Sequence, residues 1–169
     1  VGNEPELFPF ISSCSIACGG HAGDETSMEA TIRLARQHGV KVGPPPAYPD
    51  REHFGRITMS IGRKDLQYSL ENQLKGFMAV MRALDAPLHH IKAHGALYND
   101  LATGGSLAES YLEVLEPYRQ EAVLYVPCGS SFNGMAASRG FTIWEEGFAD
   151  RAYEPDGSLV SRTRPGALS

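Results

Sequence analysis

The hydrophobic positions of this chain follow a helical period over one long stretch. Apolar residues recur at helical spacing at Leu66, Leu70, Leu74, Phe77, Met81 and Leu84. This spacing predicts a long helix with one buried face. Ala86 and Pro87 follow the last apolar position, and a proline there is typical of a helix end.

Shorter segments between polar or glycine-rich stretches are typical of strands, because small and apolar residues alternate or run together in them. The expected strands cover residues 13–18, 40–43, 89–93, 122–127 and 141–147. Three further helices are expected over residues 24–39, 106–120 and 131–139. The stretch "HGALYND" after the third strand is expected to be its exit loop.

The first of these helices carries clear end signals. Asp24 is a natural N-cap, and Thr26 with Glu29 offers a capping box as a competing start. Gly39 is expected to end the helix.

Strands that alternate with helices predict βαβ units and a mostly parallel sheet, either doubly wound or closed into a barrel. Polar motifs follow four of the expected strands: "GGHAGD", "GPPPAYPD", "KAHGALYND" and "EGFADRAY". Site residues distributed over many strand ends are typical of a TIM-like barrel, whereas a doubly wound sheet gathers them at one switch point. We therefore expect an α/β barrel, formed by a single domain over residues 1–169.

Composition narrows the class of partner. The chain has 169 residues, of which 42% are hydrophobic and 21% charged, with a formal net charge of −5. Its lysines and arginines are dispersed, so nothing favours nucleic acid or an anionic membrane surface. No apolar run is long enough for a transmembrane helix and no leader is visible, so the cytoplasm is the expected location. The three cysteines are expected to be reduced thiols.

The ends of the sequence suggest a truncated chain. It opens on Val1 without a methionine and stops at Ser169 within what reads as a loop. We therefore expect that residues of a complete site are absent.

Glycines surround His21 in "ACGGHAGD", and their lack of side chains lets a substrate or metal approach the imidazole. Asp24, three residues later, is either a helix cap or a site carboxylate. Lys92 and His94 alternate with apolar neighbours, so both are expected on one face of a strand, where an inward lysine suits anion binding or oxyanion stabilisation. An exposed Lys92 is the alternative.

Two other motifs carry charged candidates. Asp150 and Arg151 form either part of a site at a strand end or a surface ion pair. Arg56 follows a glycine in a loop and is either an anion clamp or a solvent-exposed arginine.

Four motifs in order, "SIACGGHAGDETSM", "VGPPPAYPDREHFGR", "IKAHGALYN" and "EGFADRAYEPDGSLVSR", resemble those of the LamB/YcsF family. The resemblance implies a distorted seven-stranded (βα) barrel related to the glycoside hydrolase/deacetylase superfamily, whose N-terminal strand is missing here. It also implies ATP-dependent opening of the lactam 5-oxoproline to glutamate, together with the 5-oxoprolinase subunits B and C.

The resemblance assigns roles residue by residue. Its catalytic positions are His21, Asp24, Lys92, His94 and Asp150. Its substrate-binding positions are Tyr48, Arg56, Tyr98, Asn99 and Arg151. His21 and His94 are also the candidate ligands of a divalent metal. The chain departs from the family at Pro45, where relatives usually supply a histidine, and at Ala93, where they usually have a proline.

Two other functions remain as alternatives. The chain is either a metal-dependent, deacetylase-like amide hydrolase, which Pro45 argues against, or a non-catalytic lactam-binding subunit, which Pro45 favours. No GxxxxGK[ST] loop is present, so ATP binding rests on the family and its partner subunits. A homo-oligomer also remains open.

Overall fold

The computed structural model describes residues 4–161 and 164–168 and has five short strands, all paired in parallel. The strands are β1 (Ser13–Ser15), β2 (Lys41–Gly43), β3 (His90–Ile91), β4 (Val123–Pro127) and β5 (Ile143–Glu146). The helices are α1 (Glu4–Leu7), η1 (Phe8–Phe10), α2 (Glu25–His38), α3 (Arg63–Ala83), α4 (Gly95–Ala102), α5 (Gly105–Leu115), η2 (Glu116–Tyr118) and α6 (Ser131–Ser138).

The strands stand side by side in the order of the chain. β1 pairs with β2, and β3, β4 and β5 form a second ladder. Backbone hydrogen bonds join the two ladders, since the amides of His89, Lys92 and His94 donate to the carbonyls of Val42, Pro44 and Pro46 at 3.1, 3.3 and 3.0 Å. This order confirms the parallel α/β arrangement, and it lacks the reversal of a doubly wound sheet. A closed barrel is not confirmed, because β1 and β5 do not pair among the described residues.

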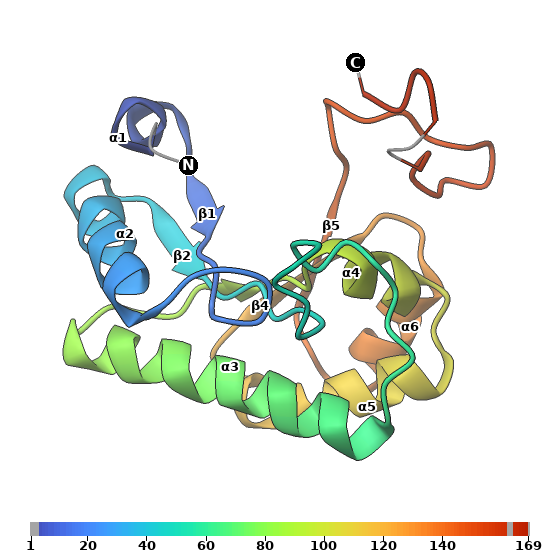
Figure 1. The fold of residues 1–169 in the computed structure, drawn as a ribbon, viewed down its shortest axis with the longest axis horizontal. Coiled ribbons are helices and arrows are strands. Elements are labelled where there is room, and N and C mark those ends of the chain that lie inside the picture. Colours follow the sequence, from blue (N-terminus) through green and yellow to red (C-terminus); the bar gives the residue numbers. More distant parts are fainter. Residues whose placement is uncertain (1–3, 162–163, 169) are drawn as a thin grey trace.

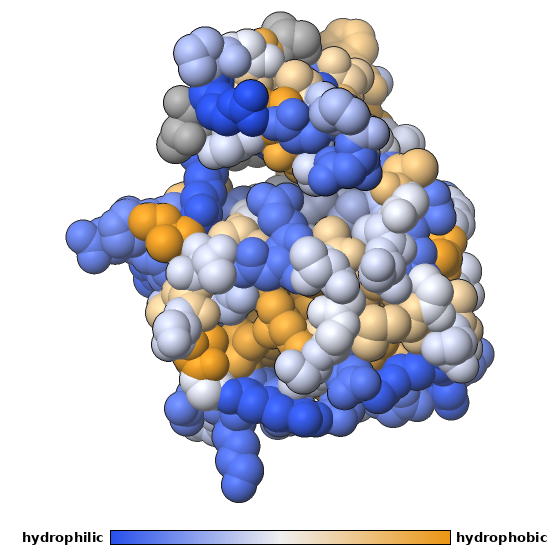
Figure 2. Space-filling model, turned by 90° about the vertical axis from the view of Figure 1, so that its right-hand side faces the viewer, coloured by the Kyte–Doolittle hydropathy of each residue, from blue (hydrophilic) through white to orange (hydrophobic). Residues whose placement is uncertain are grey.

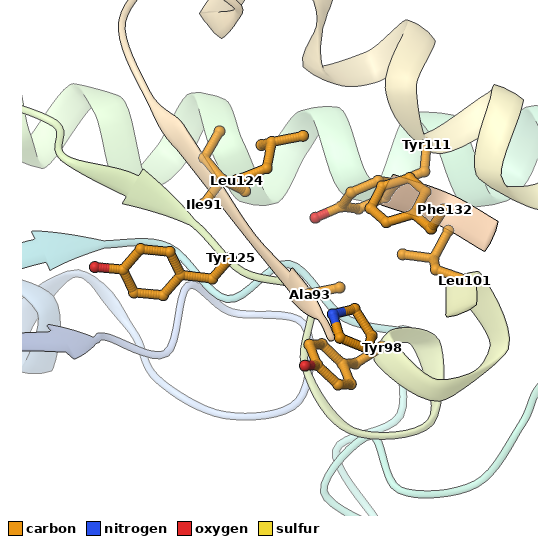
Figure 3. Close-up of a pocket in the computed structure, with 9 residues that line it drawn as sticks. Ile91, Ala93, Tyr98, Leu101, Tyr111, Leu124, Tyr125 and Phe132 are labelled. Carbon is orange, nitrogen blue, oxygen red and sulfur yellow. The ribbon is translucent and has the colours of Figure 1, made fainter. Parts of the chain in front are cut away.

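Helices cover one face of the strands (Figure 1), and apolar side chains fill the space between them. Val42, Ile91 and Leu124 point into this core. The opposite face carries aromatic and polar side chains, and Figure 3 shows Tyr125 on the side of β4 opposite to Leu124. The Tyr125 hydroxyl donates to Ser13 Oγ at 3.4 Å, from β4 to β1, which indicates that the sheet curves around this polar face.

The helix predictions are confirmed for α2, α3, α5 and α6, with ends shifted by a few residues. α5 ends earlier than expected, at Leu115, because Pro117 follows and the chain tightens into η2. The expected loop "HGALYND" was wrong, since residues 95–102 form α4. Leu97, Tyr98 and Leu101 recur at helical spacing and are buried, so the packing of these side chains stabilises a helix in this segment.

The cap predictions resolve in favour of Asp24. Its side chain accepts from Ser27 N at 2.8 Å, and Ser27 Oγ accepts from Asp24 N at 2.9 Å. The competing start at Thr26 is therefore wrong. Gly39 ends α2 in the left-handed conformation, as expected, at φ 67°.

The segment after β5 extends beyond the helices and the sheet (Figure 1). Two antiparallel bridges hold it, between Arg151 and Leu168 and between Tyr153 and Leu159. In the space-filling view a small opening is visible beneath the upper part of the molecule (Figure 2). None of the helices in the described part of the chain has the length and apolar character needed to cross a membrane.

Candidate functional site

Two histidines from different strand exits stack on each other. The His21 and His94 rings lie 3.7 Å apart between centroids and are inclined by 9°. Phe54 presents its ring at steep angles to both, with centroids 4.8 Å from His21 and 5.3 Å from His94. Since these residues follow β1, β3 and β2, three strand exits converge at one point, as the sequence predicted for the two histidines.

Glycines allow this close approach. Phe54 and Gly55 both have positive φ, 58° and 65°, so the chain turns sharply over the histidines. A Cβ on Gly55 would lie 3.0 Å from His21 Cβ, and one on Gly95 would lie 2.2 Å from the Gly55 carbonyl oxygen. That carbonyl accepts from Ala96 N at 2.9 Å, which fixes the turn against α4.

A buried glutamine on α3 ties two of the strand exits together. Gln73 accepts from Ala47 N and donates to Ala47 O, each at 2.9 Å. A Cβ on Gly20 would lie 2.3 Å from Gln73 Oε1, so this part of the His21 loop requires glycine. Gln73 was not among the residues predicted from the sequence, although its place among the apolar positions of the long helix marks it as an inward-facing polar residue.

His21 is a neutral imidazole near pH 7. Burial lowers the pKa of His21 from 6.5 to about 4, and nearby positive charges act in the same direction. These charges belong to His94, Arg51 and Arg56. His21 Nδ1 is buried with no hydrogen-bond partner among the described residues, which makes it a position for a polar group of a ligand or for water.

His94 is oriented by the turn that covers it. Its Nε2 lies 3.0 Å from the Phe54 carbonyl oxygen. Because a carbonyl can only accept, Nε2 carries the proton in this contact. Arg51 supports the same loops from outside, donating to the carbonyls of Gly19 and Gly23 at 3.2 Å.

The donor set does not fit a divalent metal. The described residues contain no group of three or more His, Cys, Asp or Glu side chains that could hold one. Nitrogen lone pairs lie in the imidazole planes, so the nearly parallel His21 and His94 rings do not aim at a common ion. Pro45, which departs from the family pattern, is buried and cannot supply a ligand.

Lys92 lies in a second cluster at the same strand exit. Its Nζ pairs with Glu146 Oε1 at 2.7 Å, and both side chains are about a quarter exposed, at 22% and 23%. Nζ also lies 4.5 Å from the Phe148 ring centroid and 5.6 Å from that of Tyr98. The alternative of a fully exposed Lys92 is therefore wrong. Glu146 was not predicted from the sequence, although a carboxylate at the end of a strand is a usable signal.

The predicted substrate-binding residues Tyr48, Tyr98 and Asn99 differ in their burial and in their polar contacts. Tyr48 is buried and donates to Asp100 Oδ2 at 2.8 Å, so its hydroxyl is already paired. Tyr98 is buried beside Lys92, and burial together with the Glu146 carboxylate raises its pKa. Asn99, on the other side of α4, is exposed.

The remaining charged candidates lie apart from the histidine stack or at its edge. Arg56 is exposed, and its guanidinium lies 5.0 Å from the Phe54 ring centroid. Arg151 donates to the carbonyls of Val160 and Ala167 at 2.7 and 3.3 Å, so it anchors the C-terminal segment. Asp150 is exposed, and within the described part of the chain the structure shows no ion pair between it and Arg151.

The cavity that the structure contains near Tyr98 does not open onto the histidines. It measures about 10 Å³, room for roughly one water. Figure 3 shows it between the sheet and the helices, with Leu101, Tyr111 and Phe132 on the helix side. The His21 and His94 rings are in contact, and that they face one common cavity stays a prediction.

Asp24 provides a direct test between capping and catalysis. Asp24→Ala is expected to cost about 1 kcal/mol of stability, because the cap bond to Ser27 is lost. Asp24→Asn keeps a cap acceptor and should retain most of that stability in urea unfolding. If Asp24→Asn instead matches Asp24→Ala, the cap hydrogen bond is not what the carboxylate contributes.

Two buried histidines predict acid lability. The folded-state pKa of both His21 and His90 is about 4, against 6.5 for the ordinary side chain. Between these values the unfolded chain binds more protons, so stability is complete above pH 6.5 and falls as the pH drops toward 4. Each histidine contributes at most about 3 kcal/mol to this loss.

Urea unfolding at about pH 7 and about pH 4.5 measures this loss. His90→Gln should lose less stability on acidification than the wild type, because it lacks the buried imidazole. If the wild type and His90→Gln lose the same stability on acidification, burial of a neutral His90 is not a source of the acid lability.

Comparison with known proteins identifies the same family as the sequence motifs. The model of the LamB/YcsF family matches residues 1–169. The chain is 38% identical over 168 residues to the A subunit of 5-oxoprolinase from Pyrococcus furiosus, covering 99% of this chain and 66% of that protein. It is also 38% identical over 168 residues to the A subunit of 5-oxoprolinase from Symbiobacterium thermophilum, covering 99% of this chain and 64% of that protein.

A solved structure shows the same arrangement of strands and helices. The lactam utilization protein from Thermus thermophilus superimposes with a TM-score of 0.90 at 33% identity, covering 99% of this chain and 68% of that one. The chain thus spans about two thirds of the length of the proteins it matches. Since the family model covers the whole chain, the chain belongs to the LamB/YcsF family.

Proposed function

We propose that this chain is part of the A subunit of a 5-oxoprolinase, which opens the lactam 5-oxoproline to glutamate together with subunits B and C. The observation that carries the proposal is the stacked His21–His94 pair, which is assembled from separate strand exits beside Arg56. The names of the relatives support the substrate class. We further propose that the arc of five strands belongs to a (βα)7 barrel in the full-length protein.

The two histidines suit hydrolysis of an amide. A neutral imidazole accepts a proton from an attacking water, and the lowered pKa of His21 keeps it neutral at physiological pH. The water oxygen bonds to the lactam carbonyl carbon while its proton passes to His21 Nδ1. This nitrogen is buried, so the substrate gains access when the Phe54–Gly55 turn is displaced.

Arg56 suits the carboxylate of the substrate. It makes no ion pair with another described residue, and its guanidinium is exposed next to the histidine stack. A planar guanidinium binds a carboxylate through two parallel hydrogen bonds. Arg56 therefore anchors the carboxylate of 5-oxoproline in the proposed complex.

In this proposal ATP is used by the three-subunit complex and not by this chain alone. Opening an unstrained lactam needs activation of a poor amide carbonyl, which ATP would supply. The N-terminus of α2 is already occupied by the Asp24 carboxylate, so it offers no phosphate site. We therefore assign nucleotide handling to the partner subunits.

Reconstitution tests the proposal. The full-length protein, mixed with cognate subunits B and C, 5-oxoproline and ATP, should release glutamate and ADP in equal amounts, and should release little glutamate alone. Absence of glutamate from the complete mixture would contradict the enzymatic assignment. Binding of 5-oxoproline without turnover would support the non-catalytic lactam-binding subunit, which Pro45 favours.

A further inference from the structure

Lys92 and Arg56 differ in how their charges are compensated. Lys92 is paired with Glu146 at 2.7 Å, and the pair is about three-quarters buried on both sides. Arg56 is exposed and has no carboxylate partner among the described residues. An anionic ligand is attracted to the uncompensated guanidinium, whereas at Lys92 it would meet the Glu146 carboxylate next to the ammonium.

The surroundings of Lys92 restrain its position. Lysine has a long flexible stem, so holding its ammonium in one place requires several contacts. Here the carboxylate of Glu146 provides an ion-pairing partner, and the faces of Phe148 and Tyr98 provide cation–π contacts at 4.5 and 5.6 Å. The ammonium is thus fixed before any substrate binds.

The two clusters lie a short distance apart on one segment. Lys92 and His94 are two residues apart where the backbone runs extended alongside the segment that follows β2, so their Cα atoms are separated by about 6.6 Å. The amides of both residues donate to that neighbouring segment, at 3.3 and 3.0 Å, which confirms the extended run. This spacing suits a small ring compound that contacts both clusters.

We propose that Glu146 is a positioning residue that holds the Lys92 ammonium for proton donation to the departing lactam nitrogen, while Arg56 anchors the substrate carboxylate. When the C–N bond breaks, its electron pair stays on the nitrogen, which takes a proton from Lys92. The resulting Lys92 amine regains a proton from water. This assignment rests on the proposed function, since it names the roles within that reaction.

Chemical acetylation tests the positioning role without any activity. Full-length wild type, Glu146→Gln and Glu145→Gln are treated with acetic anhydride, and the modification rate of Lys92 is followed by mass spectrometry. Loss of the paired charge should raise this rate about tenfold in Glu146→Gln. Glu145→Gln is the matched control, because Glu145 bonds to Asn133 and Gly129 instead. Equal Lys92 rates in Glu146→Gln and the wild type would overturn the proposal.

Steady-state kinetics of the reconstituted complex test the division of roles. Glu146→Gln should lower kcat about tenfold with the KM for 5-oxoproline within about twofold of the wild type. Arg56→Gln should mainly raise that KM. A raised KM with unchanged kcat in Glu146→Gln would show that the pair anchors the substrate and would overturn the proposal. An inactive wild-type complex would refute the proposed function, and acetylation would still decide whether Glu146 positions Lys92.

Discussion

Lys92→Ala is expected to lower the kcat of the reconstituted enzyme about a hundredfold or more, because the ammonium no longer supplies a proton to the departing nitrogen. The measurement is glutamate release by the complete three-subunit mixture at saturating 5-oxoproline. Full activity of Lys92→Ala would remove this residue from the mechanism.

Two comparisons separate this effect from damage to the fold. Lys75→Ala removes an exposed lysine of α3 that pairs with Glu71, and it should leave kcat unchanged. Removal of Lys92 leaves Glu146 without its partner, so Lys92→Gln should be measured as well, since its amide can still donate to the carboxylate. Both Lys92 variants should lose kcat while their unfolding midpoints stay close to each other.

Gly43→Ala is expected to destabilise the chain by about 3 kcal/mol or more. A Cβ at this position would lie 1.8 Å from the backbone oxygen of His90, where β2 passes β3. The contact atom belongs to the backbone of the neighbouring strand, so relief requires the two strands to separate. Urea unfolding of the purified variant measures the loss.

Gly76→Ala is the matched substitution for this test. Gly76 lies exposed within α3, and a Cβ there would meet nothing within 4 Å. Because alanine favours helix over glycine, Gly76→Ala should raise stability by about 0.5–1 kcal/mol. If both variants have the same midpoint, the close approach between β2 and β3 does not limit the packing.

Local signals in the sequence predicted most of the elements. The apolar spacing from Leu66 to Leu84 marked α3, and Asp24 and Gly39 marked the ends of α2. α4 was missed because "HGALYND" has a glycine in its second position and carries polar residues. Its helical state depends on burial of Leu97 and Leu101 against the rest of the core, which no local pattern contains.

The site was predicted in part for a similar reason. Glycines around His21 and the alternation around His94 indicated two imidazoles at strand exits, and the structure brings them into contact. Phe54 and Gln73 were not identified, because their roles come from contacts across long sequence separations. Arg151 was placed in the site by family resemblance, but the structure shows it holding the C-terminal segment.

The same limit applies to the charge of Lys92. The sequence suggested an anion-binding lysine, but its compensation by Glu146 depends on pairing between residues 54 positions apart. Pairing of this kind changes what a lysine can bind, because the carboxylate offsets the positive charge of the ammonium and weakens its attraction for an anion. Sequence spacing alone does not show it.

The decisive measurement is a crystal structure of the full-length protein with subunits B and C and bound 5-oxoproline. We expect the lactam carbonyl group within hydrogen-bonding distance, about 3 Å, of a water held by His21, with the substrate carboxylate on Arg56 and the lactam nitrogen facing Lys92. Substrate bound away from the His21–His94 stack, with these side chains arranged as in the free chain, would contradict it.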